Sequence, residues 1–141
     1  LVHIKYLVHL LGDMHCPTHV YYYPDNMTLG KFPVKLHGVE TNYHKIWDGQ
    51  LLDSRHKFWG FQDYRHALDN YTDEEIARMT EGTPVEWFEE SARRCREIYD
   101  WVQPGDELGQ EFYNAHAPFA EYQLVLSGYR LAKVLNALFD R

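Results

Sequence analysis

Hydrophobic positions recur at helical spacing along most of the chain, and this pattern predicts a mainly α-helical, all-α fold. Leu1 to Asp13 is apolar nearly all round, which predicts a helix buried on most of its sides. Gly12 and Pro17 bracket the end of that helix. Further helices are expected at about 42–52, 61–70, from 72, at 84–102, and from 106 to the C terminus, where the last segment is one long helix or two joined near Pro118.

Capping residues mark where several of these helices begin. Thr41 or Asn42 can cap the first of them, and Thr72 with Glu75 has the spacing of a capping box. Thr83 precedes a proline at the first helical position of the next. The C-terminal segment carries an apolar stripe that is expected to face the core: Leu124, Leu131, Val134, Leu135 and Leu138.

A short stretch near residues 20–38 departs from the helical pattern. Apolar residues there alternate with polar ones around Phe32, Val34 and Leu36, which predicts an extended hairpin or loop. Pro33 indicates an edge strand, because proline has no backbone N–H to donate to a neighbouring strand. A second loop is expected over residues 54–60.

Composition places the chain among ordinary globular domains. Its 141 residues are 45% hydrophobic and 16% aromatic, which suits a single domain. We expect this domain to be a monomer. No membrane span is predicted, because the apolar run from Leu1 to Leu11 is short and is interrupted by His3, Lys5 and His9. The net charge of −7 excludes a broad basic surface for nucleic acid, so a phosphate substrate would need local cations such as bound metal ions.

Two histidine–aspartate pairs carry the candidate chemistry. His9 and Asp13 are four residues apart, as are His44 and Asp48, and that spacing puts both members of a pair on one helical face. His19 follows the first pair beyond a turn. Three imidazole and carboxylate ligands from His19, His44 and Asp48 would match a catalytic zinc site. From spacing alone, ordinary hydrogen-bonded contacts remain an equal alternative.

Three neighbouring residues have less definite roles. His15 could orient the site by holding a carboxylate or a backbone carbonyl, and a purely structural histidine is an equal alternative. Cys16 could be an additional soft ligand, although a small buried thiol is the simpler interpretation. Cys16 and Cys95 are too few for a disulfide framework, and a single bridge between them remains open.

Two longer strings resemble a known family. They are His9-Leu-Leu-Gly-Asp-Met-His-Cys-Pro-Thr-His19 and Gly38-Val-Glu-Thr-Asn-Tyr-His-Lys-Ile-Trp-Asp48. The chain resembles the C-terminal half of the S1/P1 nucleases, zinc-dependent single-strand nucleases and 3′-nucleotidases that share a multi-helix bundle with bacterial phospholipase C. The resemblance continues through Gly82-Thr-Pro, Leu108-Gly and the stretch 128–136.

This resemblance implies three zinc ions and a division of labour among the ligands. His19, His44 and Asp48 would hold one zinc, and this site is complete within the chain. His9 would bind a second zinc. Asp13 would be the catalytic carboxylate, bridging the second and third ions and orienting a hydroxide between them. The implied substrates are single-stranded DNA or RNA and 3′-nucleotides, and the products carry 5′-phosphates.

The chain also departs from the family pattern. The family's other zinc ligands would lie upstream of Leu1, in a half-domain that we expect to follow a secretory signal, so the full-length protein is expected to be secreted or periplasmic. Residues 28–30 lack the Asn of the family's substrate loop, and Cys16 replaces a Gln. The substrate-binding residues are therefore unassigned. A phospholipase C-type enzyme, which Asp48 in place of Glu argues against, and a non-catalytic zinc-binding module remain alternatives.

Overall fold

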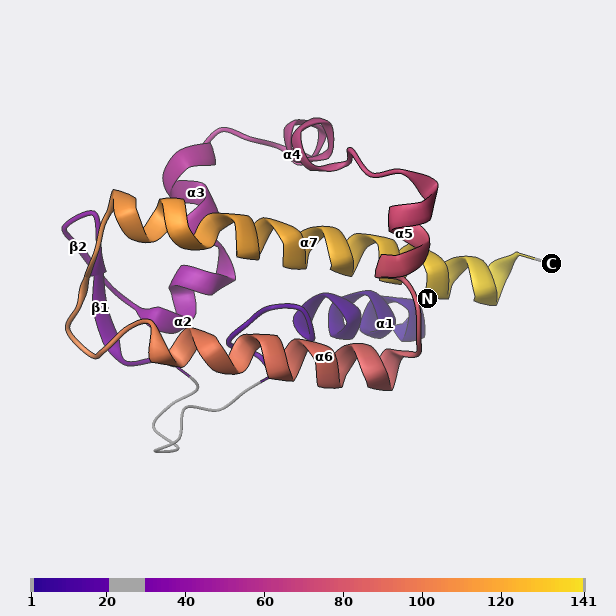
Figure 1. Ribbon diagram of the computed structural model, residues 1–141, viewed down its shortest axis with the longest axis horizontal. Helices are drawn as coiled ribbons and strands as arrows, with labels where there is room; N and C mark the ends of the chain where they lie inside the picture. The colour runs from indigo at the N-terminus through magenta and orange to yellow at the C-terminus, as the bar shows by residue number, and fades with distance from the viewer. Residues whose placement is uncertain (1, 21–29, 141) are drawn as a thin grey trace.

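A computed structural model describes residues 2–20 and 30–140. It confirms the mainly α fold, with one small sheet (Figure 1). The elements in chain order are α1 (Val2–Asp13), β1 (Pro33–Leu36), β2 (Val39–Asn42), α2 (Tyr43–Lys45), the π-helical turn η1 (Ile46–Gln50), α3 (Leu51–His56), α4 (Phe61–Leu68), α5 (Asp73–Met79), α6 (Pro84–Arg96), the 3-10 turn η2 (Glu97–Asp100), β3 (Glu107–Leu108) and α7 (Gln110–Phe139).

The long helix α7 organises the molecule. Figure 1 shows α6 and α7 running side by side in opposite directions, with α1 behind them and with α4 and α5 on the side of α7 away from α6. Helices α1, α3 and α5 all pack against α7. Pro118 lies within α7 without dividing it, so the C-terminal segment is one long helix.

The small sheet lies at one end of the helices and has the strand order β2-β1-β3. Strands β1 and β2 form an antiparallel hairpin whose turn uses the positive φ values of His37 and Gly38. The expectation of an edge strand at Pro33 was wrong, because β1 pairs on both sides and β3 is its parallel neighbour. Pro33 is accommodated because it is the first residue of the strand. The predicted hairpin near 20–38 lies in part outside the described residues.

The predicted helix starts near 42, 61, 72 and 84 are confirmed, whereas the start at 106 was wrong, because residues 107–108 pair with β1 as β3 and α7 begins at Gln110. Asn42, rather than Thr41, caps the second helical segment by accepting a hydrogen bond of 3.0 Å from the Lys45 N–H. Thr72 with Glu75 and Thr83 with Glu86 form capping boxes, so two helices begin where the sequence indicates. The loop expected from residue 54 begins later, because α3 continues to His56.

Tyr43 lies at the centre of the core and has no exposed surface. Its hydroxyl donates a 2.6 Å hydrogen bond to the Ile98 carbonyl, which joins the start of α2 to η2. Strand and helix side chains surround it: Phe32, Val34, Leu36, Ile46, Trp47, Leu51, Ile98, Tyr99, Val102 and Leu108. The residue before His44 is thereby fixed in the interior.

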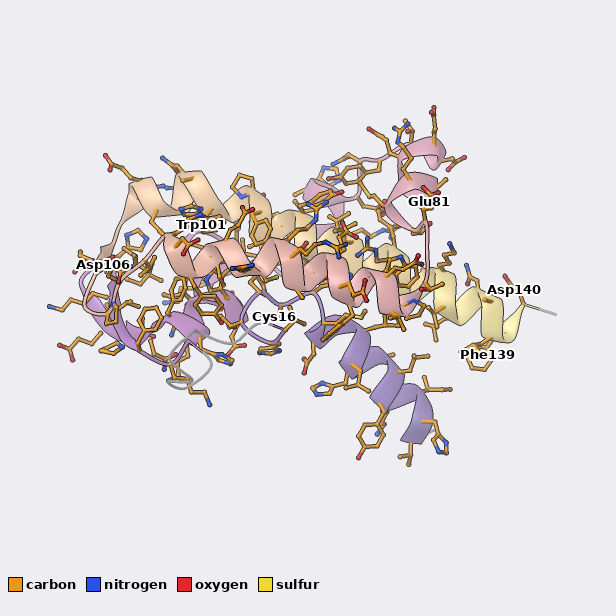
Figure 2. The ribbon with its side chains drawn as sticks, turned by 60° about the horizontal axis from the view of Figure 1, so that its bottom comes forward. Cys16, Glu81, Trp101, Asp106, Phe139 and Asp140 are labelled. Carbon is orange, nitrogen blue, oxygen red and sulfur yellow. The ribbon has the colours of Figure 1, made fainter. Side chains whose placement is uncertain are left out.

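Two predictions of burial were wrong. Leu11 alone is buried among the described residues of α1, and Figure 2 shows this helix projecting from the body with its side chains standing out. Its apolar residues contact α7 along one side only, which leaves the others exposed. The expected stripe on α7 is also displaced, since Leu124 and Leu138 are exposed and Leu131, Val134 and Leu135 are only half-buried. The buried residues of α7 are Ala117, Gln123, Leu126 and Arg130.

Across residues 2–20 and 30–140, every helix is too short or too polar to traverse a lipid bilayer.

Tyr43→Phe is expected to lower the free energy of unfolding by about 0.5–1.5 kcal/mol, because it removes a buried hydrogen bond and leaves the Ile98 carbonyl only the longer 3.3 Å bond from the Trp101 N–H. Chemical denaturation followed by circular dichroism measures the change. Tyr6→Phe is the control, since Tyr6 is 62% exposed and its loss of a hydroxyl should change stability by less than about 0.5 kcal/mol. Equal effects of the two substitutions would contradict a central role for the Tyr43 hydroxyl.

Candidate metal centre

The end of α1 folds back on itself through a series of tight backbone turns. The N–H groups of His15 and Cys16 donate 3.0 Å hydrogen bonds to the carbonyls of Gly12 and Asp13, and the His19 N–H donates one of 3.0 Å to Cys16. These bonds reverse the chain within a few residues. His19 is thereby brought opposite Asp13, from which the helix geometry alone would have separated it.

The second pair lies on α2 and the π-helical turn η1. Ile46 and Trp47 are buried in the core, so His44 and Asp48 are left on the opposite, accessible side. The His44 N–H donates a 2.8 Å bond to the Gly30 carbonyl, which anchors the start of the segment. Gly30 has a φ of 73°, and a Cβ there would lie 3.3 Å from the Tyr99 ring, so glycine suits the position on both counts.

The five predicted ligands form one continuous series of contacts. His9 Nε2 lies 3.3 Å from Asp13 Oδ2, and Asp13 Oδ1 lies 3.5 Å from His19 Nδ1. His19 Nε2 lies 3.0 Å from Asp48 Oδ1, while Asp48 Oδ2 lies 3.4 Å from His44 Nε2. The rings of His19 and His44 also stack, with centroids 5.1 Å apart. His19 therefore joins the two pairs.

These separations suit a shared cation. Two nitrogen or oxygen donors that bind one zinc ion at about 2.0–2.2 Å in tetrahedral geometry lie roughly 3.3–3.6 Å apart. Three of the four contacts fall in or next to that interval, and the contact between His19 and Asp48 is somewhat shorter at 3.0 Å. A neutral imidazole has only one N–H, yet both nitrogens of His19 face carboxylates. A cation bound beside the ring would satisfy the side that lacks the N–H.

The cluster lies at the surface. The side chains of Asp13 and Asp48 are 41% and 42% exposed and that of His9 is 66% exposed, whereas His44 is the most enclosed at 15%. The helix that carries His9 and Asp13 was expected to be buried on most of its sides, but it projects from the body and leaves both side chains accessible. A substrate could reach these groups from solvent.

The whole chain matches a known family. The model of the S1/P1 nuclease family aligns with residues 1–140. The chain belongs to the S1/P1 nuclease family. It is 26% identical to Endonuclease 4 of Arabidopsis thaliana over 97% of its own length and 50% of that protein. It is 27% identical to Endonuclease 2 of the same plant and 26% identical to Nuclease S1 of Aspergillus oryzae, over 96% of the chain in both cases.

The chain thus spans about half the length of these nuclease relatives. Residues 9–19 and 38–48, which carry the resemblance in the sequence, lie inside the matched region. The assignment of individual ligands within this S1/P1 chain stays a prediction, to be tested by experiment.

Cys16 lies within the same cluster. Its Sγ, a His19 nitrogen and an Asp48 oxygen all lie within 4.8 Å of one another, so these three residues could hold a metal ion. Burial raises the pKa of the Cys16 thiol to about 11 in the metal-free protein. Cys16 and Cys95 are both free thiols, so the bridge that the sequence left open is absent.

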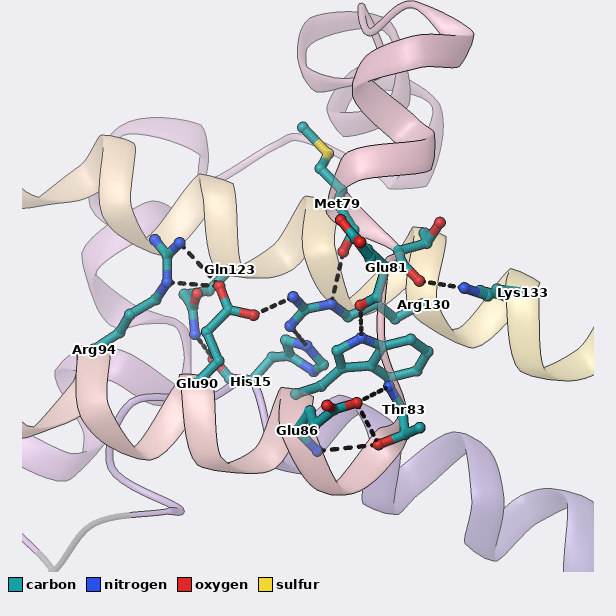
Figure 3. A network of polar contacts seen from close by, with 12 residues as sticks. His15, Met79, Glu81, Thr83, Glu86, Glu90, Arg94, Gln123, Arg130 and Lys133 are labelled. Carbon is teal, nitrogen blue, oxygen red and sulfur yellow. Dashed lines mark hydrogen bonds and ion pairs between the residues drawn. The ribbon is translucent and has the colours of Figure 1, made fainter.

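His15 does not contact any of the five predicted ligands in the interactions that the structure shows. It is buried, and Figure 3 shows it among side chains from several helices. Its Nδ1–H donates a 2.8 Å bond to the Leu11 carbonyl, and its Nε2 accepts one of 3.0 Å from Arg130. Of the roles that the sequence left open, His15 therefore has the one of holding a backbone carbonyl, that of Leu11. This contact fixes the end of α1. Burial, with the adjacent Arg130, lowers the pKa of His15, so the ring is neutral near pH 7.

Arg130 is the centre of this network. Its guanidinium pairs with Glu90 of α6, donates to the Met79 carbonyl at 2.9 Å and lies over the Trp87 ring. Gln123, which precedes Arg130 by about two turns of α7, donates a 3.1 Å hydrogen bond to the His15 carbonyl. None of these residues was expected from the sequence to have a role. The only signal was a charged residue within the apolar C-terminal stretch, which indicates a buried partner.

An apolar groove adjoins the cluster. It has a volume of roughly 520 Å³ and runs between α1 and the start of α6. Asp13 and His19 lie at its edge, and Phe88, whose side chain is 47% exposed, contributes an aromatic wall. The remaining lining is aliphatic: Leu7, Leu10, Leu11, Met14, Val20, Pro84 and Val85.

Arg130→Met is expected to lower the free energy of unfolding by roughly 2–3 kcal/mol. This is less than the 3–5 kcal/mol usual for breaking a buried pair, because Glu90 is partly exposed and keeps Arg94 as a partner. Arg93→Met is the matched control, since Arg93 is 71% exposed and its contact with Glu89 is 3.9 Å long. Urea denaturation of both variants measures the difference, and similar losses would contradict the central position of Arg130.

Glu90→Gln is expected to reveal the ion pair through its pH dependence. Burial would raise the pKa of Glu90, but Arg130 and Arg94 outweigh it and hold the pKa below the ordinary 4.5. As pH falls through 4.5 the unfolded chain takes up the proton first, so the stability contributed by charged Glu90 is present above that pH and is lost below it. The stability difference between wild type and Glu90→Gln should therefore be constant from pH 6 to 8 and shrink toward pH 3. A difference that does not change with pH would contradict the ion pair.

Proposed function

We propose that His9, Asp13, His19, His44 and Asp48 bind zinc, and that this centre serves hydrolysis of phosphodiester bonds in single-stranded nucleic acid and of 3′-nucleotides. The continuous series of donor contacts of 3.0–3.5 Å supports the proposal most directly. When bound, zinc lowers the pKa of a coordinated water and polarises a phosphoryl oxygen, which are the two requirements of this hydrolysis.

The proposed roles follow from where each side chain lies. His19, His44 and Asp48 would hold one ion, because each contacts another member of this set. Asp13 contacts a histidine on either side, His9 and His19, so its two oxygens face different parts of the cluster. That position suits a carboxylate shared between ions, which could also orient the attacking oxygen. We assign it the catalytic role for this reason.

Charge and shape support an anionic substrate with an apolar part. The chain has a net charge of −7, so the attraction for phosphate must come from the metal centre rather than from a basic surface. The groove beside Asp13 and His19 is apolar and includes the exposed ring of Phe88. A nucleobase could stack there while its phosphate reaches the ligands.

The names of the relatives favour nucleic acid over lipid. Those compared above are endonucleases and a nuclease. Because the chain spans only about half of each of them, its activity is a proposal that must be measured. A phospholipase C-type activity and a zinc-binding module without activity are the outcomes that would replace it.

His44→Ala is expected to lower the zinc content of the chain, because it takes away one of the proposed His19, His44 and Asp48 ligands of one ion. Asp13→Ala should change the zinc content little, because His9 and Asp13 alone offer too few donors for a tightly held ion. Zinc content is measured by atomic absorption after dialysis. His66→Ala is the control, since His66 is exposed on α4. Zinc that survives His44→Ala but is lost with His15→Ala would show that the ligand set is wrong.

Asp13→Ala is expected to have the larger effect on hydrolysis, a loss of about 100-fold or more, because electrostatic stabilisation at the reacting phosphate depends on it. Cleavage of a single-stranded oligonucleotide is measured on this chain and on the longest polypeptide that its gene encodes, with analysis for 5′-phosphate ends. A lecithin analogue is the control substrate. Turnover of the lipid alone would favour the phospholipase alternative, and tight zinc without any turnover would favour the non-catalytic module.

A further inference from the structure

Cys16 is placed between the two halves of the metal cluster. Backbone hydrogen bonds of 3.0 Å tie its N–H to Asp13 and its carbonyl to the His19 N–H, so its position is set by the same turns that place the ligands. Its Sγ lies within 4.8 Å of both a His19 nitrogen and an Asp48 oxygen. Three kinds of donor atom from two separate segments thus face one small space.

The polar contacts of the Cys16 thiol are weak. The S–H donates to the Trp47 carbonyl at 3.7 Å, and the sulfur lies 3.8 Å from the Thr18 hydroxyl. Trp47 immediately precedes Asp48, so even this contact directs the sulfur toward the second ligand segment. A purely structural thiol is shown by Cys95, which has no exposed surface and accepts a hydrogen bond from Gln123 at 3.9 Å. Cys16 is only partly buried and borders the ligands.

We propose that Cys16 is a metal ligand and binds, together with His19 and Asp48, the ion for which His44 supplies the fourth donor. This inference rests on the proposed zinc site. On binding, the S–H bond breaks, a sulfur–zinc bond forms and the proton leaves to solvent, with no change of oxidation state. The sulfur gives up its weak contact with the Trp47 carbonyl in exchange.

A thiolate at this position changes what the ion can do. Soft sulfur donors favour zinc and cadmium over manganese and magnesium, so Cys16 would set the metal preference of the site. Four protein donors also complete a tetrahedral shell, which is typical of zinc that is held rather than of zinc that exchanges a water molecule. The exchangeable water would then belong to the His9 and Asp13 end of the cluster.

Cobalt(II) is the probe for the sulfur ligand. The zinc-free chain is titrated with cobalt and its absorption is recorded for wild type, Cys16→Ser and Cys95→Ser. We expect the visible bands of bound cobalt in all three. The near-ultraviolet charge-transfer band of a cobalt–thiolate bond should appear in wild type and in Cys95→Ser and be absent from Cys16→Ser. Competition between cadmium and manganese should show at least a 10-fold loss of the cadmium preference in Cys16→Ser, since even the loss of groups that support a ligand costs 10–100-fold.

The outcomes separate this inference from the proposed function. Visible cobalt bands without a charge-transfer band in Cys95→Ser would refute the sulfur ligand while leaving the zinc site intact. A charge-transfer band that persists in Cys16→Ser would equally refute it. The absence of every cobalt band in wild type would refute both. Because the wild-type and Cys95→Ser spectra are decisive by themselves, the test does not depend on the folding of Cys16→Ser.

Discussion

The buried guanidinium of Arg130 is the interaction on which the rest of the structure depends. It reaches α6 through Glu90, the end of α5 through the Met79 carbonyl, and the end of α1 through His15. A buried charge with so many partners is stable only when all of them are in place, because each missing partner leaves a desolvated group unsatisfied. The turn that carries Cys16 and His19 is therefore held on its inner side by the helical core. Its outer side faces solvent and carries the proposed metal ligands.

The outer side has the opposite electrostatic character. Two carboxylates, Asp13 and Asp48, face one imidazole in a chain that is already acidic overall. A divalent cation would offset this negative charge, and it would convert a region that repels phosphate into one that attracts it. Folding and metal binding thus act on the two faces of the same turn.

The features that the sequence predicted correctly depend on neighbours close along the chain. Capping by Asn42, Thr72 and Thr83 involves residues three positions away, and each His–Asp pair involves residues four positions away. The failures involve distant partners. His15 meets Arg130 across 115 positions, so no local pattern could show that a charged residue would take the place of the expected leucines in the core. Strand β3 was missed for the same reason, since two residues of extended chain gain their structure only by pairing with β1.

The projecting helix α1 has a consequence for the behaviour of the chain in solution. Val2, Ile4, Tyr6, Val8 and Leu10 present apolar surface to water, and such surface promotes self-association. The net charge of −7 opposes this, because like-charged molecules repel at distances beyond direct contact. Salt shortens the range of that repulsion to about 8 Å at physiological ionic strength and does not weaken the attraction between apolar surfaces. Buffer composition, rather than fold stability, therefore sets the concentration at which this chain remains dispersed.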